Sequence, residues 1–410
     1  MTAYDVAFSF VRAADAGQVN PILGMIDPDG IEVVDDTTIR IATRYPFGPF
    51  LNHLAHPASG ILNASVVGDY APGDANQSNI EIVGTGPYRF VEFVSDSHVE
   101  MVRFEDYFGE EPNIRELRFN IITDPSARTT AAETGEADIV LNPFPADLNR
   151  LFNDTPSVYI LEVPGLGSDY LGMQVTFPGL DDVRVRQAIN YALDTQVIVD
   201  VAFEGWSPAG DTVIAASVFG HNPYLTARTR DIDRARELME DAGFNEDNPL
   251  VLTITTNGEN LNRRAMAEIM QHDLGAIHID ASMDTMEFGA FMEARDNGEL
   301  EMFIAGWVAV TADADYAMFP LFHSSNHGAS GNQTLFDNPR VDELLDAARS
   351  TSDQEARLAY YHEAQEIIHE EAPWVILNQN NVHVVLQNNV QGLDISPTQG
   401  HFFGPVYFTD

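Results

Sequence analysis

The chain has 410 residues, 44% of them hydrophobic and 10% aromatic, a globular content that argues against disorder and allows two or three domains. Asp and Glu number 63 against 21 basic residues, all of them Arg, so the net charge is −42 and no basic stripe exists to bind nucleic acid. The chain has no cysteine, which excludes disulfides, thiolate nucleophiles and Cys-bound metals.

The acidic residues are spread along the whole chain, so we interpret them as an adaptation to high salt. In molar salt the Debye length falls to ~3 Å, which screens the self-repulsion of such a surface. The alternative is an acidic surface for a basic partner. No apolar run reaches about 18 residues, and the opening MTAYDVAFSFVRAAD lacks the basic and apolar regions of a signal peptide. The sequence therefore predicts a halophilic, acidic protein without a membrane span or signal in this chain.

The beginning of the chain predicts a helix and a hairpin. Thr2 is suited to cap a helix that continues to Ala14 with apolar residues at every fourth position. Residues 31–42 predict two short strands around a turn at Asp35–Asp36. The polar stretch 69–79 contains Pro and Gly, and it predicts a linker and the first domain boundary.

Short strands and one helix are predicted after this linker. The strands are expected in the stretches IVGTGPYRFVEFV, SHVEMVRF and IRELRFNII. The helix is predicted from about Ser126 to Thr134, where Gly135 stops it, and it leads into a strand at Ala137–Leu141.

From Asp181 onward, helices and strands alternate. A helix is predicted at DVRVRQAINYALD, and each of the strands LVLTITT, IHIDASM and LEMFIAGW follows an amphipathic helix. This alternation predicts parallel βαβ units, and in open α/β sheets ligands gather at the carboxyl ends of the strands. Trp307 lies at such an end, and the loop after it carries two acids. We therefore expect this strand end to face a ligand.

Six separate stretches carry a resemblance to a known family, in the family's order: TAYDVAFSFVRAAD, IVGTGPYRFVEF, DYFGEEPNIRELRFNIITDPSARTTAAETGEADIV, DDVRVRQAINYALD, NPRVDELLDAARS and EAPWVIL. They resemble the family 5 extracellular solute-binding proteins, which are the peptide-, nickel- and glutathione-binding receptors of ABC importers. The resemblance covers essentially the whole chain.

The resemblance implies an α/β protein with the two-lobed clamshell of the periplasmic binding proteins (type II, cluster C) and an extra small domain. It places the small domain, truncated at its N-terminus, at 1–80, part of lobe I at 81–170, lobe II at 171–390 and a return to lobe I at 391–410. Family members carry about 60–90 further residues before the first helix, including an export signal and the first strands of lobe I. The first lobe is therefore expected to be incomplete.

The function implied by the resemblance is that of a substrate-binding protein of an ABC importer. It would capture short peptides in a cleft between the lobes and deliver them to a membrane permease. It would act as a monomer outside the cytoplasm, at the cell surface or anchored to the membrane. Glutathione, a nickel complex or an oligosaccharide is the alternative ligand within the family. A secreted hydrolase is the alternative outside it, but no catalytic motif supports one, so no enzyme activity and no cofactor is predicted.

The ligand site is predicted at the strand end, from Gly306, Trp307, Asp313, Asp315 and Tyr316. In peptide-binding members the strand ending in Gly-Trp pairs with the peptide backbone, and an Asp three residues after the Trp binds the terminal ammonium. That position is Val310 here. Asp313 is therefore assigned to the ligand ammonium, because it matches a second acidic pattern of the family. Asp315 is the second candidate for this role. Capping of the following helix is the alternative role of both acids.

Three further groups of residues have two possible roles each. Arg263 and Arg264 could bind a ligand carboxylate or form surface ion pairs. Thr85 and Gly86 could present backbone N–H groups to the ligand or form a tight turn. The histidines with metal-like spacing are His53 and His56, His323 and His327, and His362 and His369. Because isolated histidines in helices and loops are usually structural, no metal site is predicted.

Overall fold

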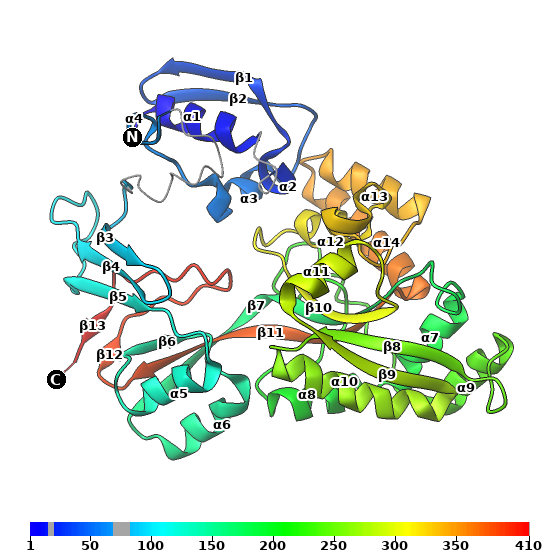
Figure 1. The fold of residues 1–410 in the computed structure, drawn as a ribbon. Helices are drawn as coiled ribbons and strands as arrows, with labels where there is room; N and C mark the ends of the chain where they lie inside the picture. Colours follow the sequence, from blue (N-terminus) through cyan, green and yellow to red (C-terminus); the bar gives the residue numbers. More distant parts are fainter. Residues whose placement is uncertain (15–19, 69–82, 410) are drawn as a thin grey trace. The chain divides into compact units, whose positions relative to one another are not determined.

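The computed structural model describes most of the chain, namely residues 1–14, 20–68 and 83–409 (Figure 1). The predicted linker at 69–79 lies outside the described residues. Within the described part of the chain, none of the helices combines the length and the apolar character needed to cross a bilayer.

The chain forms two compact units. Unit 1 comprises Met1–Val163 and Val382–Asp410, and unit 2 comprises Pro164–Asn381. The sequence analysis places the corresponding boundaries later, at 170/171 and 390/391. Two long strands run through the boundaries without a turn or a change of composition, β7 (Val158–Met173) and β11 (Trp374–Gln387). The predicted small domain at 1–80 stays a prediction.

The predicted helix and hairpin at the beginning of unit 1 are confirmed. The hairpin closes at the pair Asp35 and Thr38, and Leu23 and Ile26 have no exposed surface. The apolar face of the first helix therefore has a small core of its own to pack on. The elements of this part are α1 (Ala3–Ala14), α2 (Asn20–Leu23), β1 (Ile26–Asp35), β2 (Thr38–Thr43), α3 (Phe50–Leu54) and α4 (Ala64–Val67).

The rest of unit 1 contains a three-stranded antiparallel sheet in the order β3-β4-β5, followed by two helices. The predicted helix near Ser126 is confirmed: its N-terminus is capped by Asp124, and Gly135 follows its end with a φ of 72°. The elements are β3 (Tyr88–Val94), β4 (His98–Arg103), β5 (Glu116–Asn120), α5 (Pro125–Glu133), β6 (Ile139–Leu141), α6 (Pro145–Asp154), β12 (Val390–Gln391) and β13 (Tyr407–Phe408).

Unit 2 is built on a mixed sheet in the order β11-β7-β10-β8-β9. Its strands β8 and β9 are parallel, and β10 is parallel to β8, so the predicted βαβ units are confirmed. Strand β7 runs antiparallel to β10 and makes the sheet mixed. The bounds are β8 (Leu250–Asn257), β9 (Ile279–Met286) and β10 (Met302–Val308).

Helices cover both faces of this sheet (Figure 1). Side chains of a strand alternate between the two faces, and β10 follows this rule: Met302 and Ile304 join one buried cluster, Phe303 and Ala305 the other. The first cluster includes side chains from α7 (Val183–Ala192), α8 (Thr195–Phe203), α9 (Ile232–Asp241) and α10 (Leu261–Leu274). The second includes side chains from α11 (Phe288–Asp296), α12 (Ala314–Phe322), α13 (Pro339–Arg349) and α14 (Gln354–Glu371).

We expect Phe303→Ala to lower the free energy of unfolding by about 3–5 kcal/mol, because the ring is 1% exposed and packs on Gly172 of the neighbouring strand. Urea denaturation measures this loss. The control is Val251→Ala on β8, whose side chain is 65% exposed and whose truncation should change stability by less than about 0.5 kcal/mol. Equal losses in the two variants would contradict the assignment of Phe303 to the core.

Candidate functional site

The carboxyl end of β10 loses one of its two neighbouring strands. Pairing with β8 is recorded only at Met302 and Phe303, whereas pairing with β7 continues to Val308. Among the described residues, the segment Ile304–Val308 therefore has a strand partner on one side only. Backbone N–H and C=O groups at such an edge can pair with an added extended chain.

Gly306 lies beneath an ion pair at this edge. Asp169 of β7 is its partner in the strand register, and Arg263 reaches over from the first turn of α10. The Nε and Nη2 atoms of Arg263 donate to Asp169 Oδ1 at 3.1 and 2.6 Å. A Cβ at position 306 would lie 2.5 Å from that oxygen and 2.6 Å from Nη2. A larger residue here would force the ends of the Asp169 and Arg263 side chains to shift.

Arg263 keeps part of its hydrogen-bonding capacity. Among the described residues, its Nη1 makes one long hydrogen bond, 3.4 Å, to Asn257 Oδ1 at the end of β8. Its side chain is 18% exposed, against 9% for Asp169. A guanidinium has five N–H donors, so the edge formed by Nη1 and Nη2 can still bind a second carboxylate.

Trp307 and Tyr316 are brought together by α12. The indole Nε1 donates to the carbonyl oxygen of Tyr316 at 2.9 Å, and the two ring centroids lie 5.2 Å apart. Burial raises the pKa of the Tyr316 hydroxyl. Trp307 is half-buried, so it packs on α12 and keeps an accessible part next to the open edge of β10.

Asp313 lies inside unit 2 and caps α12. Its carboxylate accepts from the Asp315 N–H at 2.9 Å and from Arg357 Nη2 at 2.6 Å, and the two side chains of this ion pair are 1% and 5% exposed. Burial raises the pKa of Asp313, and the hydrogen bond from Arg357 offsets part of the rise. The capping role considered in the sequence analysis is confirmed for this residue.

Asp315 also has a guanidinium partner. Arg349 Nε and Nη2 donate to its two oxygens at 3.2 and 3.1 Å, and the Asp315 side chain is 2% exposed. A ligand ammonium would have to compete with Arg349 here and with Arg357 at Asp313. The binding of a ligand by Asp313 or Asp315 stays a prediction.

Sequence reasoning missed Asp169 and Asn257 as members of this site. Asp169 is one of 63 acids, and its partner Arg263 is 94 residues away in the chain. The polar residues that end strand β8, Asn257 among them, could have indicated the site, because ligands of α/β sheets gather at the carboxyl ends of strands.

The comparisons with known proteins decide the family. The model of the bacterial extracellular solute-binding proteins, family 5, matches residues 1–329, which is most of the chain. The chain is a family 5 solute-binding protein. The resemblance found in the sequence is thereby confirmed.

Named relatives of this solute-binding protein bind peptides and glutathione. It is 29% identical over 425 aligned residues to the dipeptide-binding protein of Escherichia coli, covering 99% of this chain and 78% of that one. It is 30% identical to the glutathione-binding protein GsiB of Salmonella paratyphi A, covering 91% and 72%. The structure of Helicobacter pylori DppA in complex with the peptide STSA matches with a TM-score of 0.84 and 27% identity, covering 99% and 81%. The predicted fold, that of the two-lobed periplasmic binding proteins, is confirmed by this match.

Several of the histidines with metal-like spacing have hydrogen-bond partners in the fold. His53 Nδ1 lies 2.8 Å from the Ile22 carbonyl oxygen, and His362 Nε2 lies 3.1 Å from that of His221. Within the described ranges, the group with metal-like geometry is a different one, in unit 1: Glu92, His98 and Glu100. There, Arg118 Nη1 donates to Glu100 Oε1 at 2.6 Å, and its positive charge opposes cation binding.

We expect Asp313→Asn to lower the free energy of unfolding by about 3–5 kcal/mol, because it leaves the Arg357 guanidinium buried without a carboxylate. Urea denaturation at fixed salt measures the effect. The control is Glu363→Gln, which removes one of the two carboxylates beside the exposed Arg340 and should cost less than about 1 kcal/mol. A loss below about 1 kcal/mol for Asp313→Asn would show that the buried ion pair does not hold α12 in place.

Proposed function

We propose that this solute-binding protein captures short peptides at the carboxyl end of β10 and presents them to an ABC permease. The edge of β10 at Gly306–Val308, where the residues are partly exposed, carries the proposal, because an extended peptide can pair with it as an added strand. The relatives include a dipeptide-binding protein and a periplasmic binding protein in complex with the peptide STSA, which support the same ligand class.

In the proposed binding mode, the peptide backbone and one peptide side chain make separate contacts. Hydrogen bonds to β10 would hold any peptide backbone, since every residue except proline offers the same N–H and C=O groups. The accessible part of Trp307 would pack against one ligand side chain. Because Gly306 has no side chain, a ligand can approach the strand backbone at the centre of this contact.

Arg263 would bind the C-terminal carboxylate of the peptide. Asp169 holds the Nε and Nη2 side of the guanidinium, which leaves the Nη1 and Nη2 side for the ligand. The positive end of the α10 dipole lies at the same place and adds to the attraction. The site would therefore prefer peptides with a free C-terminus.

Several properties follow from the proposed role. The protein would act outside the cytoplasmic membrane, as the family description "extracellular" supports, and as a monomer that binds its permease in a ligand-dependent way. The net charge of −42 supports function in concentrated salt. Glutathione is the second candidate ligand, favoured by the 30% identity to a glutathione-binding protein.

The test is calorimetry in molar salt with two- to five-residue peptides, their C-terminal amides and glutathione. We expect peptides with a free C-terminus to bind. Their C-terminal amides should bind about tenfold more weakly or worse, because they lose a charge-assisted hydrogen bond. Arg263→Gln should abolish this difference, whereas the control Arg234→Gln, at an exposed ion pair, should keep it. Mass spectrometry of the recovered peptides should find them intact.

The outcomes separate the parts of the proposal. Absence of binding by every peptide would overturn the peptide function, and binding of glutathione alone would assign the second candidate. Equal binding of acids and amides would remove the role of Arg263 and leave peptide capture standing. Cleaved peptides would favour the hydrolase alternative.

Gly306→Ala should weaken peptide binding about tenfold or more, because the new Cβ displaces the ion pair of Asp169 and Arg263 from the strand. Calorimetry with the best peptide measures the change. The matched control is Gly275→Ala, where a Cβ meets nothing within 4 Å and φ is −58°. Unchanged affinity in Gly306→Ala would place the ligand away from this strand.

A further inference from the structure

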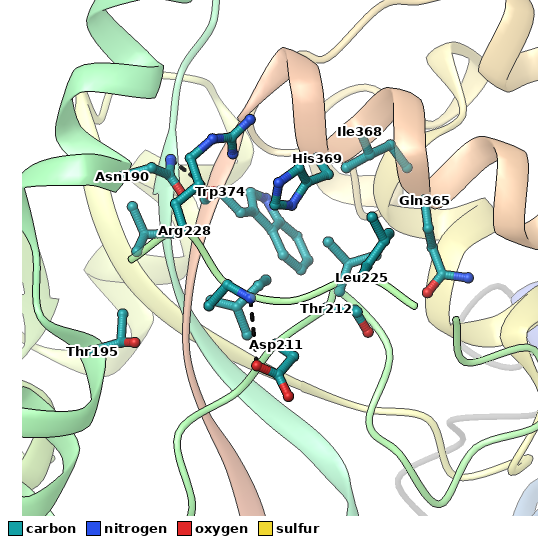
Figure 2. Close-up of a pocket in the computed structure, with 14 residues that line it drawn as sticks. Asn190, Thr195, Asp211, Thr212, Leu225, Arg228, Gln365, Ile368, His369 and Trp374 are labelled. Atoms are coloured by element: carbon teal, nitrogen blue, oxygen red, sulfur yellow. Dashed lines mark hydrogen bonds between the residues drawn. The ribbon is translucent and has the colours of Figure 1, made fainter. Parts of the chain in front are cut away.

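A small cavity lies within unit 2, between α7, α14, the start of β11 and the segment 211–228 (Figure 2). Its volume is about 40 Å³. A cavity needs about 10–15 Å³ of such volume to hold one water, so this one has room for a small ligand and not for a peptide. Its walls share none of the residues placed at the end of β10.

The Arg228 guanidinium brings a buried positive charge to this cavity. Its side chain is only 7% exposed, and the carboxylate recorded beside it, Glu370 Oε1, is 3.7 Å away on a side chain that is 74% exposed. Such a distant and hydrated partner compensates little of the charge. Behind the guanidinium lies the ring of Tyr191, with its centroid 5.7 Å away. A cation taken out of water in this way is stabilised by a nearby anion.

The Trp374 indole supplies an independent observation. The residue is 6% exposed, and its Nε1–H has no hydrogen-bond partner among the described residues. The ring cannot turn away easily, because it stacks on Tyr170 with centroids 3.4 Å apart and packs against Phe322. Trp374 lines the cavity that Arg228 also lines (Figure 2). A buried indole N–H without an acceptor is expected to find one in an ordered ligand.

Two titratable groups complete the wall. Burial and the charge of Arg228 lower the pKa of His369, so at neutral pH the ring is neutral and offers one N–H donor. The carboxylate in the wall is Asp211, an exposed residue that already accepts from the Ala227 N–H at 3.4 Å. In Figure 2 this carboxylate lies on the opposite side of the drawn residues from the Arg228 guanidinium. The donors therefore gather at one end of the cavity.

We propose that this cavity binds one small inorganic anion of the chloride class, held between the Arg228 guanidinium, the Trp374 N–H and the His369 ring. The anion neutralises the buried cation and accepts the orphaned indole hydrogen. It ties α14 and β11 to the segment that carries Arg228, so its effect is on the stability of unit 2. The proposal is independent of the ligand at β10.

Bromide is the probe, because it replaces chloride in such sites and is visible by anomalous scattering. Crystals of the whole chain grown or soaked in sodium bromide should show an anomalous peak in this cavity. In solution, the melting temperature should be higher in sodium chloride or bromide than in sodium gluconate at equal ionic strength. Trp374→Phe keeps the ring and removes the N–H, and it should weaken halide binding about tenfold, as should Arg228→Gln. The control Arg230→Gln alters an exposed Arg two residues away and should leave halide binding unchanged.

A cavity without anomalous bromide density would overturn the proposal, as would equal melting temperatures of the unaltered protein in chloride and gluconate. These two measurements need no variant, so they decide the matter even where Arg228→Gln fails to fold. A halide-dependent stabilisation that survives in both Trp374→Phe and Arg228→Gln would place the anion elsewhere and also overturn the proposal.

Discussion

The separation of β10 from β8 after Phe303 is the constraint on which the candidate site depends. Up to that residue β10 is an inner strand with both edges paired and both faces buried. Beyond it the chain still needs partners for its backbone groups, and β7 supplies them on one side only among the described residues. A buried strand thereby ends in a short open edge whose position is fixed by the sheet. Rigid strands hold a site more accurately than loops do.

Arginine connects the elements around this edge. The chain has 21 Arg and no Lys, and several guanidinium groups of unit 2 are turned inward. Arg263 ties α10 to β7, Arg349 ties α13 to α12, and Arg357 ties α14 to α12. The planar guanidinium can serve two partners at once, which suits it to such contacts better than an ammonium group.

The acids near the strand end have positional roles in this arrangement. Asp169 orients Arg263, and Asp313 fixes the start of α12, on which Trp307 rests. Each of these two carboxylates accepts a hydrogen bond from a guanidinium. These ion pairs hold Arg263, α12 and Trp307 in fixed positions at the end of β10.

The sequence by itself determined the alternation of helices and strands after Asp181, the parallel strands of unit 2 and the place of Trp307 at a strand end. These features depend on local periodicity, caps and turn residues, which neighbouring residues encode. Only the tertiary structure decided which charges meet. Asp313 and Arg357 are 44 residues apart, and Asp169 and Arg263 are 94 apart. Among 63 acids no spacing rule singles out the partners, because an ion pair depends on where the fold brings two side chains and on how far it excludes water from them.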